Sequence, residues 1–418
     1  MNVYLKNRNY RTLTNASLLN AIGNSLYNIV FIVYASTLSF NTLAISLASA
    51  TIFIPSFFQP FIGHIADKTK NKFKWVIISR IGQVILFLSL ARLILLEGTL
   101  SLFLILLLIN VLGDCLGMFS GALQLPFIKL LVPEDDLVEA MGFQNGLNTL
   151  IQLIFQGVGA LAIVKLNYNF SLFGLINSFT FLLAALVIIT QYNVLSSLEK
   201  QLTTHSFPAT SSFKKDFKET IQIFMSNPFL KMLISYAVLI NLLFSSSEGL
   251  INISLLKREV LWFENLPNTI ALISISTSVG LLLGSLLTMD FFKHIKTNSI
   301  ISLVLGNAFL LSISIVVIQS KLLLILLLFT FGYLLGKLNP RLSAYMISEV
   351  PENKLGLTSG IFNVLVMAGT PLGQLIFLGS ANLVNDVISW ALFGFLGILF
   401  FFLAITTSKN VVDPITAK

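Results

Sequence analysis

The segment VPEDDLVEAMGFQN at residues 132–145 occurs a second time, in altered form, as VPENKLGLTSGIFN at residues 350–363. Aligned without a gap, the two segments share Val, Pro, Glu, Leu, Gly and Asn at six positions, always 218 residues apart in a chain of 418 residues. A repeat at about half the chain length indicates that the second half of the chain is built on the same plan as the first.

The sequence on both sides of each segment is strongly apolar. Hydrophobic residues make up 56% of the chain and charged residues only 11%, whereas a soluble domain carries about 25% charged residues. Apolar runs such as 100–111 and 321–335 belong to windows long enough to cross a bilayer, which takes about 20 residues per helix. The sequence therefore predicts an all-α integral membrane protein, because helices satisfy their own backbone hydrogen bonds in lipid.

Polar breaks divide the apolar sequence into twelve predicted transmembrane helices. The first VPE segment follows span four and the second follows span ten, so each half of the chain holds six helices. We expect two parallel six-helix repeats, 1–192 and 229–418, joined by a linker over 193–228, with a substrate site near the membrane midplane. The predicted spans are 13–38, 43–66, 75–96, 100–128, 141–164, 170–192, 229–255, 268–289, 298–318, 322–347, 357–380 and 386–406.

The Lys and Arg residues predict the orientation of the chain. With the N-terminus inside, the outer side receives only five of the 26 basic residues: Arg92, Lys165, Lys257, Arg258 and Lys321. This bias predicts that both termini are cytoplasmic, and we expect the plasma membrane of a bacterium. Topology thereby explains the net charge of +8, so the sequence does not favour nucleic acid as a partner.

The linker between the halves contains one helical pattern. Apolar residues recur at helical spacing over 213–224, opposite a set of lysines. We expect a short amphipathic helix at the inner leaflet, and we interpret it mainly as a connection between the two halves.

The segment PFIGHIADKTKNKFKW, residues 60–75, follows the second span and carries a spaced glycine, aspartate and lysine, Gly63, Asp67 and Lys72. Residues 284–298 repeat the aspartate and lysines, with Asp290 and Lys293, but lack a glycine four residues before the aspartate. On these residues and the repeat, the whole chain resembles the major facilitator superfamily. The resemblance implies a transporter in which two six-helix bundles alternate access to one site.

A narrower resemblance concerns what is transported. Pro55 and Pro60 ahead of Gly63, the VPE segments, and NSFTFLLAAL at 177–186 resemble the drug:proton antiporter subgroup that includes macrolide efflux proteins. This resemblance implies a monomeric exporter of small hydrophobic drugs or antibiotics, driven by the proton gradient and without a cofactor. One departure is that 146–161, in span five, has glycines but no proline of the antiporter motif.

In such a fold, the loop residues predict a latch on the inner side. Gly63 would let two helices approach closely, and Asp67 would lie at the positive N-terminal end of helix eleven. Lysines after Asp67 would pair with acids of the opposite loops, although lysines at these places also serve as topology anchors. The predicted latch residues are Gly63, Asp67, Lys72, Glu134, Asp290, Lys293 and Glu352.

Amide side chains form polar stripes on three of the predicted spans. Unsatisfied amides in hydrocarbon are costly, so we interpret these stripes as the lining of a substrate or proton pathway. Hydrogen bonds between helices need the same residue types and stay open as an alternative. The residues are Asn20, Asn24 and Asn28 in span one, Gln152 and Gln156 in span five, and Asn241 in span seven.

Charged residues inside the spans are the strongest functional candidates, because a charged side chain in the bilayer is energetically costly and usually has a function there. Asp114 in span four is expected to load and release a proton, with Glu248 in span seven as the second candidate. Lys337 in span ten is assigned to the same pathway. The sequence leaves open that Lys337 instead neutralises Asp114 in a permanent ion pair.

The sequence argues against other kinds of chemistry. Its three histidines, His64, His205 and His294, are scattered and predict no metal site, and no nucleophile–base pair or phosphate loop predicts an enzyme. The leading hypothesis is proton-coupled drug efflux. Two alternatives stay open: a lipid or lysophospholipid translocator of the same fold, and a non-transporting membrane sensor or accessory protein.

Overall fold

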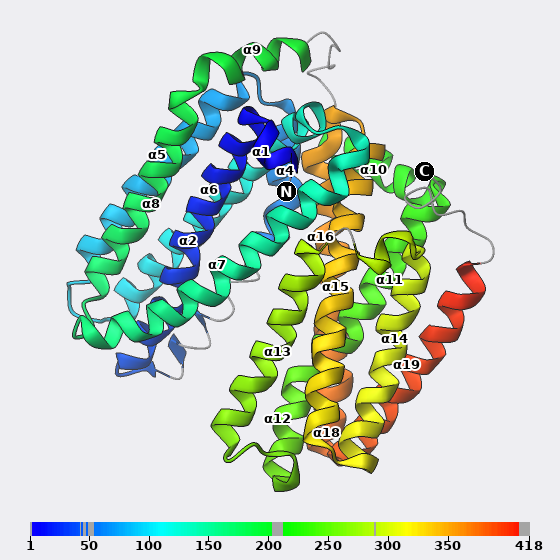
Figure 1. Cartoon of the computed structure of the whole chain (residues 1–418). Coiled ribbons are helices and arrows are strands. Elements are labelled where there is room, and N and C mark those ends of the chain that lie inside the picture. Colours follow the sequence, from blue (N-terminus) through cyan, green and yellow to red (C-terminus); the bar gives the residue numbers. More distant parts are fainter. Residues whose placement is uncertain are drawn as a thin grey trace. The chain divides into compact units, whose positions relative to one another are not determined.

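The computed structural model describes residues 2–41, 43–44, 47–48, 54–202, 212–287 and 290–408. Nearly all of these residues are helical (Figure 1). The α-helices are α1 (Asn2–Lys6), α2 (Arg8–Thr37), α4 (Ile54–Lys68), α5 (Lys72–Leu93), α6 (Leu100–Leu131), α7 (Leu137–Lys165), α8 (Phe170–Thr190), α9 (Tyr192–Leu202), α10 (Phe213–Ser226), α11 (Pro228–Phe244), α12 (Ser247–Lys257), α13 (Leu266–Leu286), α14 (Thr297–Ile313), α15 (Lys321–Glu349), α16 (Leu355–Met367), α17 (Gly369–Gly373), α18 (Gly379–Leu383) and α19 (Asp386–Ser408). Short helical turns join them, among them η1 (Glu134–Asp136), η2 (Glu259–Leu261), η3 (Phe291–His294), η4 (Ser314–Ile318), η5 (Glu352–Lys354) and η6 (Gln374–Leu378).

Most of the predicted spans correspond to long apolar helices. Within the described residues, 10 helical stretches are long and apolar enough to cross a membrane. Helices α4 and α7 occupy the two other predicted spans, 43–66 and 141–164, and α4 is described only from Ile54 onward. The prediction of an all-α membrane fold is confirmed.

Side chains just before the helices set where several of them begin. The first amides of a helix have no acceptor inside the helix, and a short polar side chain at the preceding position accepts hydrogen bonds from them. Such caps precede α2, α6, α8, α11 and α13, and the capping residues are Asn7, Thr99, Asn169, Asn227 and Asn265. Four asparagines of the sequence thus have a structural role at helix ends.

Contacts divide the chain into two compact units, which depart from the predicted halves at two short segments. The first of the two VPE regions contributes 141–146, at the start of α7, to the second unit. The second contributes 347–361, including the start of α16, to the first unit. Unit one therefore comprises 1–140, 147–220 and 347–361, and unit two comprises 141–146, 221–346 and 362–418.

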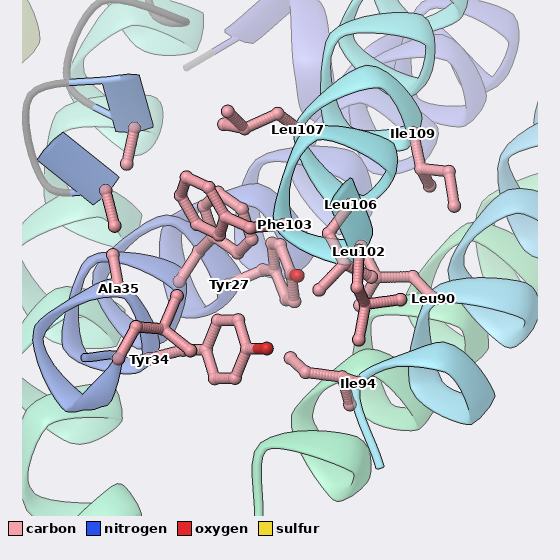
Figure 2. Packing of buried hydrophobic residues seen from close by; sticks show 14 of the residues in the cluster. Tyr27, Tyr34, Ala35, Leu90, Ile94, Leu102, Phe103, Leu106, Leu107 and Ile109 are labelled. Carbon is pink, nitrogen blue, oxygen red and sulfur yellow. The ribbon is translucent and has the colours of Figure 1, made fainter. Parts of the chain in front are cut away.

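The core of unit one is rich in aromatic rings (Figure 2). Tyr27 and Phe31 of α2 are stacked with ring centroids 5.7 Å apart, and Phe31 stacks on Phe103 of α6 at 5.8 Å. Phe87 of α5 meets the edge of Tyr27 at 5.0 Å. Aromatic pairs in these geometries are favourable beyond the area they bury, so the cluster fixes α2, α5 and α6 against one another.

Unit two contains a close contact between the backbones of α13 and α15. A Cβ atom added to Gly280 would lie 2.2 Å from the carbonyl oxygen of Phe329, and one added to Gly332 would lie 2.1 Å from that of Thr277. Gly284 and Gly336 continue the same contact one turn further along. Small residues permit this approach of two membrane helices, and the contact brings the polar end of α15 beside the end of α13.

Candidate functional site

Asp67, in the last turn of α4, binds the N-terminal end of α16. Its carboxylate accepts hydrogen bonds from the backbone N–H groups of Gly356 and Leu357, both at 2.8 Å, and all three residues belong to unit one. The side chain is only 8% exposed. The first amides of a helix lack acceptors within it and carry partial positive charge, so an acidic side chain is the complement that this helix end requires.

Gly63 lies one turn before Asp67, where α4 and α16 touch backbone to backbone. A Cβ at Gly63 would lie 2.0 Å from the carbonyl oxygen of Gly356, and a Cβ at Gly356 would lie 2.6 Å from that of Gly63. Gly360, the next turn of α16, is equally close to the backbone of Gln59. The glycines allow the approach that brings Asp67 to the amides of α16.

Burial and hydrogen bonding shift the pKa of Asp67 in opposite directions. Burial raises the pKa of Asp67 to about 7, against the hydrogen bonds from Leu357 and Gly356 and the charge of Lys72, which lower it. Asp67 lies beyond the predicted span 43–66. Lys72 is itself 9% exposed, and its ammonium donates to the carbonyl oxygens of Ala66 at 2.5 Å and Asp67 at 3.2 Å. Lys72 thus closes the end of α4 while staying near the Asp67 carboxylate.

A second basic residue, Lys129, organises the predicted acids of the VPE loops. Its ammonium donates to the carbonyl oxygens of Ser348 at 2.8 Å and Val350 at 2.7 Å, at the end of α15. It also lies within electrostatic range of Glu352, Glu349 and Glu134. Lys129 was not among the predicted latch residues, because its position at the end of an apolar span is also that of an ordinary topology anchor.

The linker helix α10 makes specific contacts with α4. Asp216, which is 8% exposed, lies 3.4 Å from Nδ1 of His64 and 3.8 Å from the ammonium of Lys68. The ring of Phe213 stacks on Phe61 of α4, with centroids 4.3 Å apart. The sequence predicted this amphipathic helix but not its partners, since periodicity identifies an apolar face without identifying what the face covers.

The same helix also reaches the loop ahead of α16. Glu219 of α10 forms an ion pair with Lys354 of η5, and both residues belong to unit one. The first half of α10 is therefore bound both to α4 and to η5, the turn that precedes α16. The linker adds a second set of bonds to the same junction.

The matching aspartate of the second repeat, Asp290, has a different set of partners. It forms an ion pair with Lys337 at 2.7 Å, accepts a hydrogen bond from the hydroxyl of Tyr333, and accepts another from the N–H of Phe292 at 3.0 Å. Partial burial raises the pKa of Asp290, but the bonds from Lys337 and Tyr333 outweigh it and hold the pKa below its usual value. Lys293 is exposed; its backbone N–H donates to the carbonyl oxygen of Asp290 at 3.0 Å, and its carbonyl accepts from Arg341 at 3.4 Å.

This arrangement revises the prediction for Lys337. The sequence assigned Lys337 to the pathway, with Asp114 as an alternative partner, and placed Asp290 separately in the latch. In the structure Lys337 pairs with Asp290 and also donates to the carbonyl of Leu287. The physical reason is the glycine contact of α13 with α15, because Lys337 follows Gly336 directly.

Asp114 and Glu248 are the acidic side chains inside the helices that the sequence selected. Asp114 of α6 is partly buried, and among the described residues no hydrogen-bond or ion-pair partner is found for it. Glu248 lies in the first turn of α12 and is exposed. Asp114 is thus a carboxyl group within a membrane helix whose charge the described part of the chain does not neutralise.

The amide stripes differ in burial. Asn20 and Asn24 are partly buried and Asn28 is exposed, while Gln152 is exposed and the side chain of Gln156 lies outside what the structure describes. Asn241, partly buried, donates to the carbonyl of Ala237 on its own helix at 3.0 Å. Of these amides, Asn20 has a partner on another helix, Arg80.

Arg80 in α5 is a buried charge that the sequence prediction overlooked. Its side chain is 2% exposed, and its guanidinium donates to Asn20 of α2 and to Gln83 of α5. Counting basic residues for topology placed Arg80 with the inner charges. Its apolar neighbours in WVIISRIGQVILF, residues 75–87, were the signal that it lies within the span.

Comparison with known proteins identifies the fold. A model of the Major Facilitator Superfamily matches residues 13–373, and a search of curated proteins found no match. A bacterial homologue of the iron transporter ferroportin, in an outward-facing state, covers 96% of this chain and 98% of its own with 16% identity and a TM-score of 0.67. The human organic anion transporter MFSD10 (TETRAN) has 13% identity, coverage of 94% and 98%, and a TM-score of 0.64. The proton:xylose symporter XylE has 14% identity, coverage of 95% and 96%, and a TM-score of 0.62.

Proposed function

The chain belongs to the major facilitator superfamily and is a secondary transporter, and we propose that it exports small hydrophobic drug-like molecules in exchange for protons. Alternating access at the inner side would be controlled by the junction of α4 with α16. The resemblance to drug:proton antiporters, including macrolide efflux proteins, supports the direction and the class of substrate.

The observation that supports proton coupling is that Asp114 lies within a membrane helix and has no hydrogen-bond or ion-pair partner among the described residues. A carboxylate in the middle of a membrane helix costs at least about 2.5–3.5 kcal/mol to insert, and the described residues offer Asp114 no partner. Such a group is stabilised whenever it takes up a proton. In the proposed cycle, Asp114 binds a proton from the outer side, substrate leaves, and release of the proton to the inner side resets the transporter.

The observation that supports the gating role is the binding of Asp67 to α16. Two hydrogen bonds at 2.8 Å to helix amides form only while α4 and α16 are in contact, so they stabilise the closed form of this junction. Three further contacts lie beside this junction: Lys129 binds the carbonyl oxygens of Ser348 and Val350, Asp216 pairs with Lys68 of α4, and Glu219 pairs with Lys354 of η5. The transmembrane potential supplies about 2.3 kcal/mol per proton at 100 mV, which is comparable to the free energy of one such bond.

A susceptibility test in a drug-sensitive bacterial host addresses this proposal. We expect the gene to raise the inhibitory concentration of one or more hydrophobic antibiotics, with a macrolide in the panel. Asp114→Asn should abolish the increase at equal amounts of protein in the membrane, and Asp135→Asn, in exposed η1, should leave it unchanged. Equal resistance from Asp114→Asn would remove Asp114 from the mechanism.

The lipid alternative predicts a different result for the same protein. In proteoliposomes, a lipid translocator would move a fluorescent lysophospholipid between leaflets and give no antibiotic resistance in cells. A non-transporting sensor would show neither activity. The proposal of drug efflux requires resistance in cells and no faster lipid movement than in protein-free vesicles.

A further inference from the structure

Arg80 has an environment that is unusual for a buried cation. It is the ninth residue of α5, about 12 Å along the helix from Lys72, and its side chain is 2% exposed. Among the residues that the structure describes, no carboxylate lies within ion-pair distance of its guanidinium. Buried charges are normally paired, because an isolated charge is strongly disfavoured away from water.

The guanidinium is held in a fixed position by neutral amides. Nη1 donates to Oδ1 of Asn20 and, at 2.9 Å, to Oε1 of Gln83. Gln83 is oriented in turn, because its amide nitrogen donates to the carbonyl oxygen of Gly113 at 2.9 Å. Asn20 and Gln83 therefore position Arg80 without cancelling its charge.

The same guanidinium has donor capacity that the described residues do not use. An arginine carries five N–H donors in a planar fork, and the hydrogen bonds found here start from Nη1. Nε is buried and has no acceptor. A buried N–H without an acceptor is uncommon in folded proteins, and a bound water, an ion or a ligand can supply the acceptor.

Gly117 of α6 lies beside this cluster and has no side chain of its own. A Cβ at Gly117 would lie 3.2 Å from the amide nitrogen of Gln83 and 3.8 Å from Oδ1 of Asn20. At this turn α6 thus presents backbone to Asn20 and Gln83, the two residues that position Arg80.

We propose that Arg80 binds an oxyanion, a carboxylate or phosphate group, carried by the transported molecule. The planar fork of a guanidinium matches the two oxygens of such a group, and hydrogen bonds between charged partners are about twice as strong as neutral ones. This inference rests on the proposed transport function and narrows its substrate class from hydrophobic molecules in general to amphiphiles with an anionic head. Asn20 and Gln83 act as positioning residues for Arg80.

A matched pair of fluorescent probes tests this assignment on the purified full-length protein. The probes are 11-(dansylamino)undecanoate and its methyl ester, which differ in the charge of the head group, and dodecyl phosphate serves as a non-fluorescent competitor. We expect the acid to bind at least tenfold more tightly than the ester and dodecyl phosphate to displace it. Arg80→Gln should remove this preference while the ester still binds, and Arg80→Lys should retain part of it.

The control is Arg92→Gln, which removes an exposed charge from the other end of the same helix and should leave the tenfold preference intact. Equal binding of acid and ester by the wild-type protein, or an unchanged preference in Arg80→Gln, would overturn the proposal. The wild-type comparison decides the question even if the Arg80→Gln variant does not fold. Because the assay measures binding without a proton gradient, failure of proton-coupled efflux would leave its result unaffected.

Nanodiscs separate the two sources of an oxyanion. If the ligand is a soluble amphiphile, the preference for the acid persists in nanodiscs of phosphatidylcholine and of phosphatidylglycerol. If it is a lipid head group, phosphatidylglycerol abolishes the preference of the wild-type protein but has no effect on Arg80→Gln. Either pattern supports an oxyanion at Arg80, and so does loss of the preference in both kinds of nanodisc, because both lipids carry a phosphate group. Loss of the preference in detergent micelles that contain no phosphate or carboxylate contradicts it.

Discussion

Replacing Asp67 by asparagine should loosen the start of α16 from α4. Asparagine keeps one acceptor oxygen, so one of the two amides bound at 2.8 Å loses its acceptor and faces an NH2 group. A buried donor left without an acceptor costs about 1–3 kcal/mol. The closed junction should therefore be weakened by about 1–3 kcal/mol, a roughly 5- to 150-fold increase in opening.

Hydrogen exchange of the full-length protein measures this opening directly. The amides of Gly356 and Leu357 lie in the first turn of α16, where no acceptor within the helix protects them. Exchange of the segment 352–361 should accelerate by the stated factor in Asp67→Asn and stay at the wild-type rate in Asp135→Asn. Unchanged exchange in Asp67→Asn would show that Asp67 does not hold the junction, and the latch would have to be abandoned.

Three further results are expected at the same junction. Gly63→Ala should destabilise the protein by about 1–3 kcal/mol through overpacking, because the added Cβ would lie 2.0 Å from the carbonyl oxygen of Gly356. Gly121→Ala should not destabilise the protein, because a Cβ at Gly121 would meet nothing within 4 Å. Thermal unfolding of the two variants and the wild-type protein measures the difference. Asp216→Asn should speed hydrogen exchange over 213–220, since it weakens the contacts with α4, and unchanged exchange would mean that α10 is held by other bonds. In the closed junction the pKa of Asp67 is raised to about 7 by burial, whereas a hydrated carboxyl titrates near about 3.9. Closing therefore takes up a proton, so protection of 352–361 should be strongest at acidic pH and fall as pH rises through about 7, and this dependence should vanish in Asp67→Asn.

Hydrophobicity and the internal repeat were sufficient to predict the membrane fold. A span needs about 20 predominantly apolar residues whatever its neighbours are, so long helices such as α6 and α14 are visible in the sequence as long, mostly apolar runs. The spacing of Gly63 and Asp67 also predicted a contact between helices. A glycine one turn before an acidic residue lets a second helix approach closely enough for its N-terminal amides to bind the acid. These features depend on local sequence, which is why they were predictable.

Partners distant in the sequence were not predictable in the same way. The ion pair of Lys337 with Asp290 depends on the glycine contact between α13 and α15, which brings together residues 47 positions apart. Asp216 and His64 meet because α10 folds back on α4, and nothing in the helical period of 213–224 specifies that surface. Arg80 was overlooked because the count of basic residues that predicts topology treats every Lys and Arg near an inner helix end in the same way.

The most direct test of coupled transport is proton movement driven by substrate. The purified protein is reconstituted into proteoliposomes that enclose a pH-sensitive dye, and the antibiotic with the largest effect in the susceptibility screen is added outside. The wild-type protein and Asp135→Asn should move protons in response to the antibiotic gradient, and Asp114→Asn should bind the antibiotic without moving protons. Proton flux from Asp114→Asn equal to that of the wild type, or no substrate-dependent flux from the wild type, would contradict the account.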